Sequence, residues 1–150
     1  MTGQAGDVRA IARRLVEDDL NTGDPAVARE LVSPEFVDHS NPPGLQHGLD
    51  GHLGIVAIFH AAFPDVAWSI DDMFAAGDKV CLRLTMRGTH RGDFFGIPPT
   101  GRRVEVPGTH VVRIRDGKVV EHWGHNDDLA LMRQLGVLPD PPAAPADGSP

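Results

Sequence analysis

The chain has 150 residues, and its 41% hydrophobic and 23% charged content is that of a single globular domain. Its 14 basic and 21 acidic residues give a net charge of −7, which argues against nucleic acid or an anionic membrane as a partner. It has no apolar run of the ~18 residues that span a bilayer and no N-terminal signal pattern, so we expect a cytoplasmic protein.

The N-terminal part of the chain predicts about three helices. Apolar residues recur at helical spacing within residues 7–21, 24–32 and 49–62. In the second of these segments, Asp24 followed by Pro25 is typical of a helix start. Between the second and third helices, residues 35–39 predict a brief strand and residues 40–48 a loop rich in proline and glycine.

After Pro64 the pattern changes to strands, which we expect at residues 66–76, 79–90, 103–115 and 118–123. A short helix is expected at residues 128–135, and the tail from residue 139 is rich in proline and alanine and is predicted to be disordered. Helices followed by a run of antiparallel strands predict an α+β fold, in which a curved antiparallel sheet packs on the helices. We expect one domain over residues 1–138.

Several kinds of chemistry are excluded by residue type and spacing. Cys81 is the only cysteine, so the chain has no internal disulfide, and we expect a buried, inert thiol. The eight histidines show no HExxH spacing, and His122 and His125 would lie on opposite faces of a strand, so no metal site is predicted. Lys79 and Lys118 lie beside turns, which argues against a Schiff base. Acid/base chemistry without a cofactor remains.

Two segments contain candidates for such chemistry. His110 shares a strand face with Val112 and Ile114, so its imidazole should point to the apolar side, either as a core histidine or as a pocket residue. Asp127 and Asp128 follow the last strand, where a helix cap needs only one carboxylate. We expect Asp128 to be the cap, which leaves Asp127 available for other work.

Several segments of the chain carry motifs of one known protein family. Residues 88–101, GTHRGDFFGIPPTG, are similar to the signature GTHxGxFxGxPPTG. Residues 116–123, DGKVVEHW, followed by Asp127 and by QLG at residues 134–136, resemble the ending DGKIxExWxxxD…QLG. In these motifs the chain resembles the SnoaL-like polyketide cyclase family of the NTF2-like superfamily, and the resemblance covers roughly residues 7–138.

The resemblance implies an NTF2-like cone around an apolar pocket and an intramolecular aldol-type cyclisation of a polyketide-like or aromatic carbonyl substrate, without metal or Schiff base. It implies that Asp127 is the catalytic acid/base and His110 a second catalytic residue of the pocket. An apolar cavity would raise the pKa of such a carboxyl, and an imidazole N–H would stabilise an enolate oxygen. Substrate-binding residues are expected at the pocket or its mouth: Asp38, His39, His90 and Trp123.

Fold by itself does not decide function. The same scaffold hosts isomerases, hydratases and dehydratases, epoxide hydrolases and cofactor-free hydroxylases, and it also hosts non-catalytic proteins that bind small molecules. The alternative hypothesis is therefore another of these reactions or a binding protein. Because an exposed sheet face is common in this architecture, we also expect a homodimer.

Overall fold

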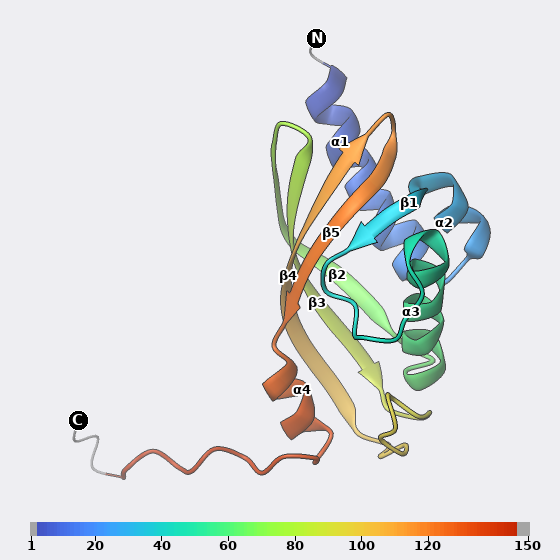
Figure 1. The fold of residues 1–150 in the computed structure, drawn as a ribbon. Helices are drawn as coiled ribbons and strands as arrows, with labels where there is room; N and C mark the ends of the chain where they lie inside the picture. Colours follow the sequence, from blue (N-terminus) through green and yellow to red (C-terminus); the bar gives the residue numbers. More distant parts are fainter. Residues whose placement is uncertain (1–2, 147–150) are drawn as a thin grey trace.

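A computed structural model describes residues 3–146 of the chain (Figure 1). Its centre is a five-stranded curved sheet with the order β1-β5-β4-β3-β2. The strands are β1 (Val32–Asp38), β2 (Ala67–Ala76), β3 (Lys79–Thr89), β4 (Arg103–Arg115) and β5 (Lys118–Asn126). Four of them pair antiparallel, as expected, whereas β1 pairs parallel with β5. The sheet is therefore mixed, because β1 reaches its partner through crossovers rather than through a hairpin.

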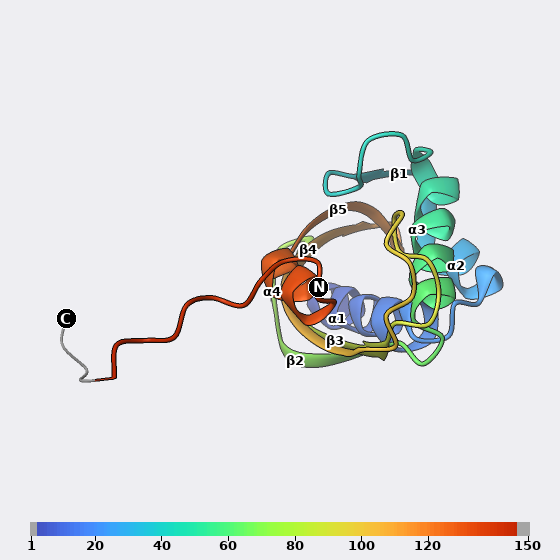
Figure 2. The same cartoon turned by 90° about the horizontal axis from the view of Figure 1, so that it is seen from below.

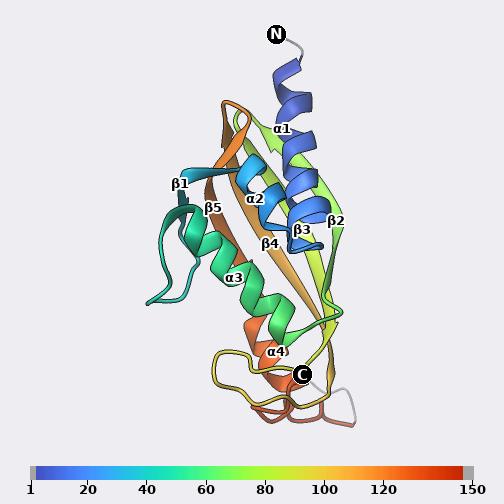
Figure 3. The ribbon, with the colours of Figure 1, turned by 90° about the vertical axis from the view of Figure 1, so that its right-hand side faces the viewer.

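The helices cover the concave side of the sheet (Figures 2 and 3). They are α1 (Gly3–Arg14), a π-helical turn η1 (Leu15–Leu20), α2 (Pro25–Leu31), α3 (Gly48–Ala62) and α4 (Asp128–Gln134). Seen from below, the sheet curls around α1, and α3 lies across its open side (Figure 2). Helix α4 lies at the lower end of the sheet (Figure 1). The α+β cone expected from the sequence is confirmed.

The first helix begins earlier than residue 7, and the π-helical turn ends it at Leu20. Asp24 caps α2 as predicted, since its Oδ1 accepts a hydrogen bond of 2.9 Å from the backbone N–H of Ala26. None of the helices in the described part of the chain is long and apolar enough to cross a membrane. Residues 139–146 form no helix or strand, and residues 147–150 of the predicted tail lie outside the described residues. The boundary at residue 138 and the disorder of the tail stay predictions.

Two apolar clusters hold the helices on the sheet. The first packs α1, η1 and α2 on the sheet and includes Val16, Leu31 and Val80. The second packs the end of α3 and α4 on the strands and includes Phe63 and Leu135. These five side chains are each no more than 2% exposed, so burial of apolar surface stabilises both ends of the cone. Between its ends the cone is hollow.

A β-bulge in β5 decides which side chains face this interior. Arg113 pairs with Glu121, but the next residue, Ile114, pairs with Val119, so Val120 is an extra residue on β5. A bulge reverses the inward and outward alternation that follows it. Strand β5 also extends three residues beyond the expected end at Trp123.

Candidate active site

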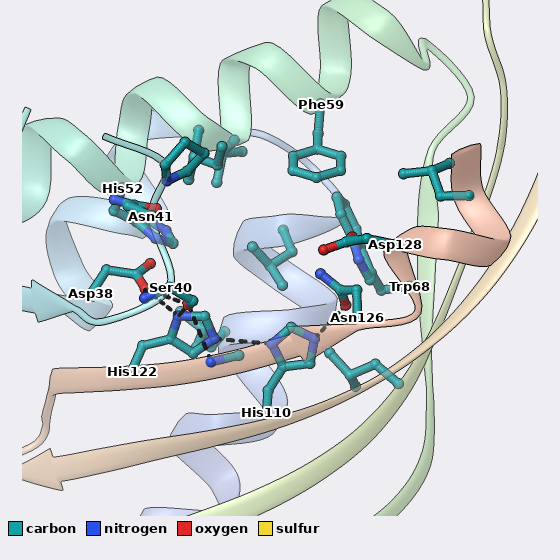
Figure 4. A pocket seen from close by; sticks show the side chains of 18 of the residues that line it. Asp38, Ser40, Asn41, His52, Phe59, Trp68, His110, His122, Asn126 and Asp128 are labelled. Atoms are coloured by element: carbon teal, nitrogen blue, oxygen red, sulfur yellow. Dashed lines mark hydrogen bonds and ion pairs between the residues drawn. The ribbon is translucent and has the colours of Figure 1, made fainter. Parts of the chain in front are cut away.

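A cavity of ≈ 420 Å³ lies between the sheet and the helices (Figure 4). Most of its lining is apolar, from η1, α3, α4, the strands and the loop after β3, and includes Leu20, Ile55, Phe59, Trp68, Phe94 and Met132. The polar side chains in its wall are few: Asp38, Ser40, Asn41, His52, His110, His122, Asn126 and Asp128. An apolar cavity with a small number of convergent polar groups is typical of a small-molecule site.

A chain of hydrogen-bonded side chains runs along the sheet wall of the cavity (Figure 4). Oδ1 of Asp38, at the end of β1, lies 2.9 Å from Nδ1 of His122 on β5. Nε2 of His122 lies 3.0 Å from Nδ1 of His110 on β4, and the two rings stack with centroids 5.2 Å apart. Nε2 of His110 in turn lies 3.1 Å from Oδ1 of Asn126. Three neighbouring strands therefore hold four polar side chains in one connected row, which we call the imidazole chain.

Two glycines make room for the imidazole chain. A Cβ atom at Gly124 would lie 2.7 Å from Nδ1 of His110 and 2.8 Å from Nε2 of His122, closer than real Cβ atoms approach. A Cβ atom at Gly108 would overlap Oδ1 of Asn126 and lie 3.0 Å from Nε2 of His110. A side chain at either position would therefore displace the imidazole rings from one another.

The surroundings of the imidazole chain lower the pKa values of two of its members, Asp38 and His110. Burial alone would raise the pKa of Asp38, but the hydrogen bond and charge of His122, with two hydrogen bonds from Ser40, lower it to about 2. Burial, together with the charge of His122, lowers the pKa of His110 to about 4. At neutral pH Asp38 is therefore ionised and His110 is uncharged.

Two arrangements of protons satisfy the hydrogen bonds of the imidazole chain. In one, His122 is neutral and donates Nδ1–H to Asp38, His110 donates Nδ1–H to His122, and the amide of Asn126 turns its N–H toward Nε2 of His110. In the other, His122 carries both protons, and His110 donates Nε2–H to the amide oxygen of Asn126. The arrangements differ by one proton on the imidazoles. The imidazole chain can therefore take up a proton from the cavity, or release one, without losing a hydrogen bond.

Asp127 and Asp128 have positions opposite to those expected from the sequence. Oδ1 of Asp127 accepts a hydrogen bond of 3.0 Å from the backbone N–H of Ala130, so Asp127 is the N-cap of α4. Asp128 lies in the wall of the cavity, and its carboxylate points into the space near Asn126 and Trp68 (Figure 4). The expectation that Asp128 is the cap is wrong. Strand β5 runs on to Asn126 and α4 begins at Asp128, so Asp127 occupies the capping position just before the helix. The catalytic role of Asp127 stays a prediction without support from this geometry.

Trp123 and His39, which were expected at the pocket or its mouth, lie on the outer face of the sheet. The ring of His39 stacks on Trp123 with centroids 4.9 Å apart, and its Nε2 lies 2.8 Å from Oε2 of Glu121. Lys79 and Arg113 also lie over the Trp123 ring. The bulge at Val120 explains the difference, because unbroken alternation from Val119 would have turned position 123 inward.

His90 is fully buried but does not line the cavity. Its ring packs on Phe63 at 5.4 Å, and its Nδ1 accepts a hydrogen bond of 3.2 Å from the backbone N–H of Thr100. Its Nε2 is the one fully buried side-chain nitrogen or oxygen without a partner within the described residues. These contacts give His90 a role in holding the loop after β3 rather than in contacting substrate.

From the sequence we did not place in the site five polar side chains of the cavity wall, Ser40, Asn41, His52, His122 and Asn126, or Asp19, the buried partner of His52. His122 and Asn126 were missed because the bulge and the extra length of β5 are tertiary features. Asp19 and His52, by contrast, left a signal: Asp19 continues the stripe of Leu15 and Val16, and His52 precedes Val56 and Phe59 on one face of α3. A polar residue at a buried stripe position marks a functional candidate. The described residues contain no cluster of three or more histidine, cysteine or acidic side chains arranged to hold a metal ion.

Comparison with known proteins agrees with the fold and the character of this site. The model of the SnoaL-like polyketide cyclase family matches residues 10–135. The chain belongs to the SnoaL-like polyketide cyclase family. It is 33% identical over 132 residues to the aklanonic acid methyl ester cyclase DnrD of Streptomyces peucetius, which covers 84% of this chain and 88% of that one. It is 32% identical over 124 residues to the nogalonic acid methyl ester cyclase of Streptomyces nogalater, covering 78% and 89% of the two chains.

Solved structures show the same fold for this cyclase. TsrD from Streptomyces laurentii superposes with a TM-score of 0.81 at 30% identity, over 89% of this chain and 97% of that one. IdmH from Streptomyces antibioticus superposes with a TM-score of 0.75 at 36% identity, over 86% and 98% of the two chains. The family resemblance seen in the sequence motifs is thus confirmed, and the protein is an enzyme of the polyketide cyclase type.

Proposed function

We propose that this cyclase closes a ring of a polyketide-like substrate by an intramolecular aldol reaction, with the imidazole chain as its proton acceptor and donor. The observation that carries the proposal is the row from Asp38 through His122 to His110, which ends at an apolar cavity. The curated relatives are named as cyclases of aklanonic and nogalonic acid methyl esters, which supports a carbonyl substrate of this class. They do not favour the alternative of a non-catalytic binding protein.

The reaction begins when the amide N–H of Asn126 turns away from Nε2 of His110, and this nitrogen takes a proton from a carbon between two carbonyl groups of the substrate. The Nδ1 proton of His110 passes to Nε2 of His122, and the resulting imidazolium is held by the carboxylate of Asp38. A lone imidazole with a pKa of about 4 is a weak base, but the relay places the new charge beside a buried carboxylate.

The enolate carbon then attacks a second carbonyl of the same molecule, and the new alkoxide oxygen takes up one proton. One carbon–carbon bond and one O–H bond form and one C–H bond breaks, so the product has the mass of the substrate. The apolar lining from Phe59, Trp68 and Phe94 holds the flexible substrate folded for attack. The substrate therefore loses its conformational entropy when it binds and not in the transition state, which lowers the barrier.

The proposal is tested with aklanonic acid methyl ester as the probe. Incubation with the wild-type chain should give a product of equal mass and different retention in liquid chromatography coupled to mass spectrometry. His110→Gln should lower kcat by ~10²–10⁴-fold, the usual contribution of a positioned base. The same substitution at His125, on the outer face of β5, is the matched control and should leave the rate unchanged. Binding of the ester without conversion would support the binding protein, and an unchanged rate in His110→Gln would exclude the relay.

We propose further that two copies of the chain pair through the outer face of the sheet. An apolar row crosses this face through residues that are cross-strand partners: Phe74, Cys81, Val111 and Trp123. Phe74 is 53% exposed in the single chain, and burial of such side chains favours association. The cytoplasmic location expected from the sequence stays a prediction, which cell fractionation tests.

A further inference from the structure

A second pair of titratable side chains lies on the helix wall of the cavity, away from the imidazole chain. Nε2 of His52, on α3, lies 2.5 Å from Oδ2 of Asp19, in the π-helical turn. The side chains of Asp19 and His52 are 1% and 7% exposed, which is rare for charged residues unless they are paired. The mechanism proposed above does not use this pair.

The pair sits in surroundings that give it no other compensation for charge. The ring of His52 meets the edge of Phe36 at 5.7 Å, and η1 presents Leu15 and Val16 beside Asp19 on the same buried side. No residue other than His52 donates a side-chain hydrogen bond to Asp19 within the described part of the chain. A lone carboxylate here would be costly, so the pair as a whole should carry no net charge.

Electrical neutrality decides where the protons of the pair lie. If Asp19 is ionised, His52 is doubly protonated, and both ring nitrogens carry hydrogen. If Asp19 is protonated, its O–H donates to Nε2, and the single ring proton of neutral His52 is on Nδ1. Both neutral arrangements therefore place a hydrogen on Nδ1 of His52. Only the arrangement with a net buried charge leaves Nδ1 bare.

Nδ1 is the ring nitrogen of His52 that is not bound to Asp19, and the ring lies in the cavity wall. Nδ1 has no hydrogen-bond partner among the residues that the structure describes, and it is not fully buried, unlike Nε2 of His90. It is therefore accessible, and the side chain of His52 lines the cavity (Figure 4). A buried carboxylate thus holds an imidazole by one nitrogen and leaves the other accessible in the cavity wall, as in hydrolase triads, which use the opposite ring nitrogens.

We propose that the Asp19–His52 pair binds and protonates the carbonyl oxygen that the enolate attacks. This inference rests on the proposed aldol function and adds a second catalytic residue, His52, with Asp19 as its positioning residue. The substrate class follows: a compound with one carbonyl-activated carbon at the sheet wall and a second carbonyl oxygen at the helix wall. As the carbon–carbon bond forms, the oxygen takes the Nδ1 proton of His52.

Both neutral arrangements of the pair reach the same end state after this transfer. Asp19 is then ionised and accepts Nε2–H of His52, Nδ1 has a lone pair, and the pair carries one negative charge, which the resting protein avoids and which lasts only until the pair is reprotonated. The imidazole chain has gained the proton taken from carbon, and the pair has lost the proton given to oxygen. Transfer of one proton from the first to the second through water restores the enzyme, so the sum of the steps is an isomerisation.

The protonation of His52 is tested by NMR of the free protein labelled with ¹⁵N, without any turnover. Long-range ¹H–¹⁵N spectra at neutral pH distinguish a ring nitrogen with a bound hydrogen from one with a lone pair. We assign the His52 signals as those that are lost in Asp19→Leu/His52→Phe. The inference expects a protonated Nδ1, and a signal typical of a lone pair on that nitrogen would overturn it.

The catalytic role is tested with the same double variant, because replacing both members by apolar residues leaves no unpaired buried charge. The melting temperature should stay close to that of the wild type. With aklanonic acid methyl ester, kcat should fall ~10²–10³-fold, as on loss of one donor to a developing oxyanion, while KM changes little. His47→Phe, the same substitution just before α3 at an exposed residue outside the lining of this cavity, is the control and should keep the wild-type rate.

The outcomes separate this inference from the proposed function. A folded double variant with wild-type kcat would overturn the role of the pair and leave the His110 relay standing. A wild-type chain that does not convert the ester would contradict the proposed function on that substrate. In that case, addition of the ester should still shift the Nδ1 signal of His52 if the pair binds carbonyl oxygen, and an unmoved signal would overturn it.

Discussion

Burial lowers the pKa of His110 from 6.5 to about 4, and this single residue should make stability depend on pH. Below about pH 6.5 this histidine is protonated in the unfolded chain, whereas in the folded chain it stays unprotonated down to about pH 4. Acid therefore favours the unfolded state within this window, by up to about 3 kcal/mol. The stability that ionised Asp38 contributes is lost only at lower pH, between 3.8 and about 2, where its carboxylate becomes protonated.

Chemical denaturation of the wild type and of His110→Gln at pH 7, 5.5 and 4.5 measures this effect. The free energy of unfolding of the wild type should fall more steeply with acid than that of the variant. Parallel pH profiles for the two proteins would contradict the burial of a neutral His110.

The neighbouring residues Asp127 and Asp128 provide a second test at the scale of one residue. Asparagine is as good a helix cap as aspartate, so Asp127→Asn should keep both the stability and the rate. Asp128→Asn removes a negative charge from the cavity wall, where it favours the imidazolium formed in the relay, and should lower kcat/KM about tenfold. The assignment made from the sequence motif expects the opposite ranking, so steady-state rates of the two variants decide between them.

At the scale of the element, strand β5 controls the site through its bulge and its glycine. Gly124→Ala would place a methyl group 2.7 Å from Nδ1 of His110 and break the contact between the two imidazoles. We expect kcat to fall ~10²-fold and stability to fall by about 1–3 kcal/mol. Gly54→Ala, in α3 with open space around it, is the matched control. It should keep the rate and stabilise the helix by up to about 1 kcal/mol.

The helices act on the site as elements too. Helix α3 carries His52, Ile55 and Phe59 to the cavity on one face, and η1 carries Asp19 to meet His52. A π-helical turn inserts an extra residue per turn and is often found at functional sites. Here it ends the helix against β2, where the side-chain amide of Asn21 exchanges two hydrogen bonds, of 3.0 and 2.7 Å, with the backbone of Trp68.

At the scale of the whole molecule, the outer sheet face should determine the oligomeric state. Trp123→Glu places a charge at one end of the apolar row and should convert a dimer into a monomer. Val137→Glu, an equally drastic change at a residue that is 50% exposed beyond α4, should leave the dimer intact. Light scattering coupled to size-exclusion chromatography measures both masses. A wild-type monomer, or a dimeric Trp123→Glu, would contradict the proposed interface.

Much of this molecule follows from the sequence itself. The helical spacing of apolar residues, the Asp24–Pro25 helix start and the alternation in residues 79–90 depend on neighbours along the chain, and the structure confirms the elements they predict. His110 was expected to face the apolar side for the same local reason, and it lines the cavity. The cone was predicted from the resemblance to the family, because several specific motifs occur in the family's order along the chain.

Other features were decided only by the tertiary structure. A one-residue bulge in β5 turned His122 inward and Trp123 outward, and no local pattern announces where two strands slip in register. The parallel pairing of β1 brought Asp38 beside His122, and the packing of α3 on η1 joined Asp19 to His52, 33 residues apart in sequence. Sequence thus specified which residues could do acid/base chemistry, whereas contacts between distant segments decided which of them meet, because only burial and a close partner give a titratable side chain its chemical role.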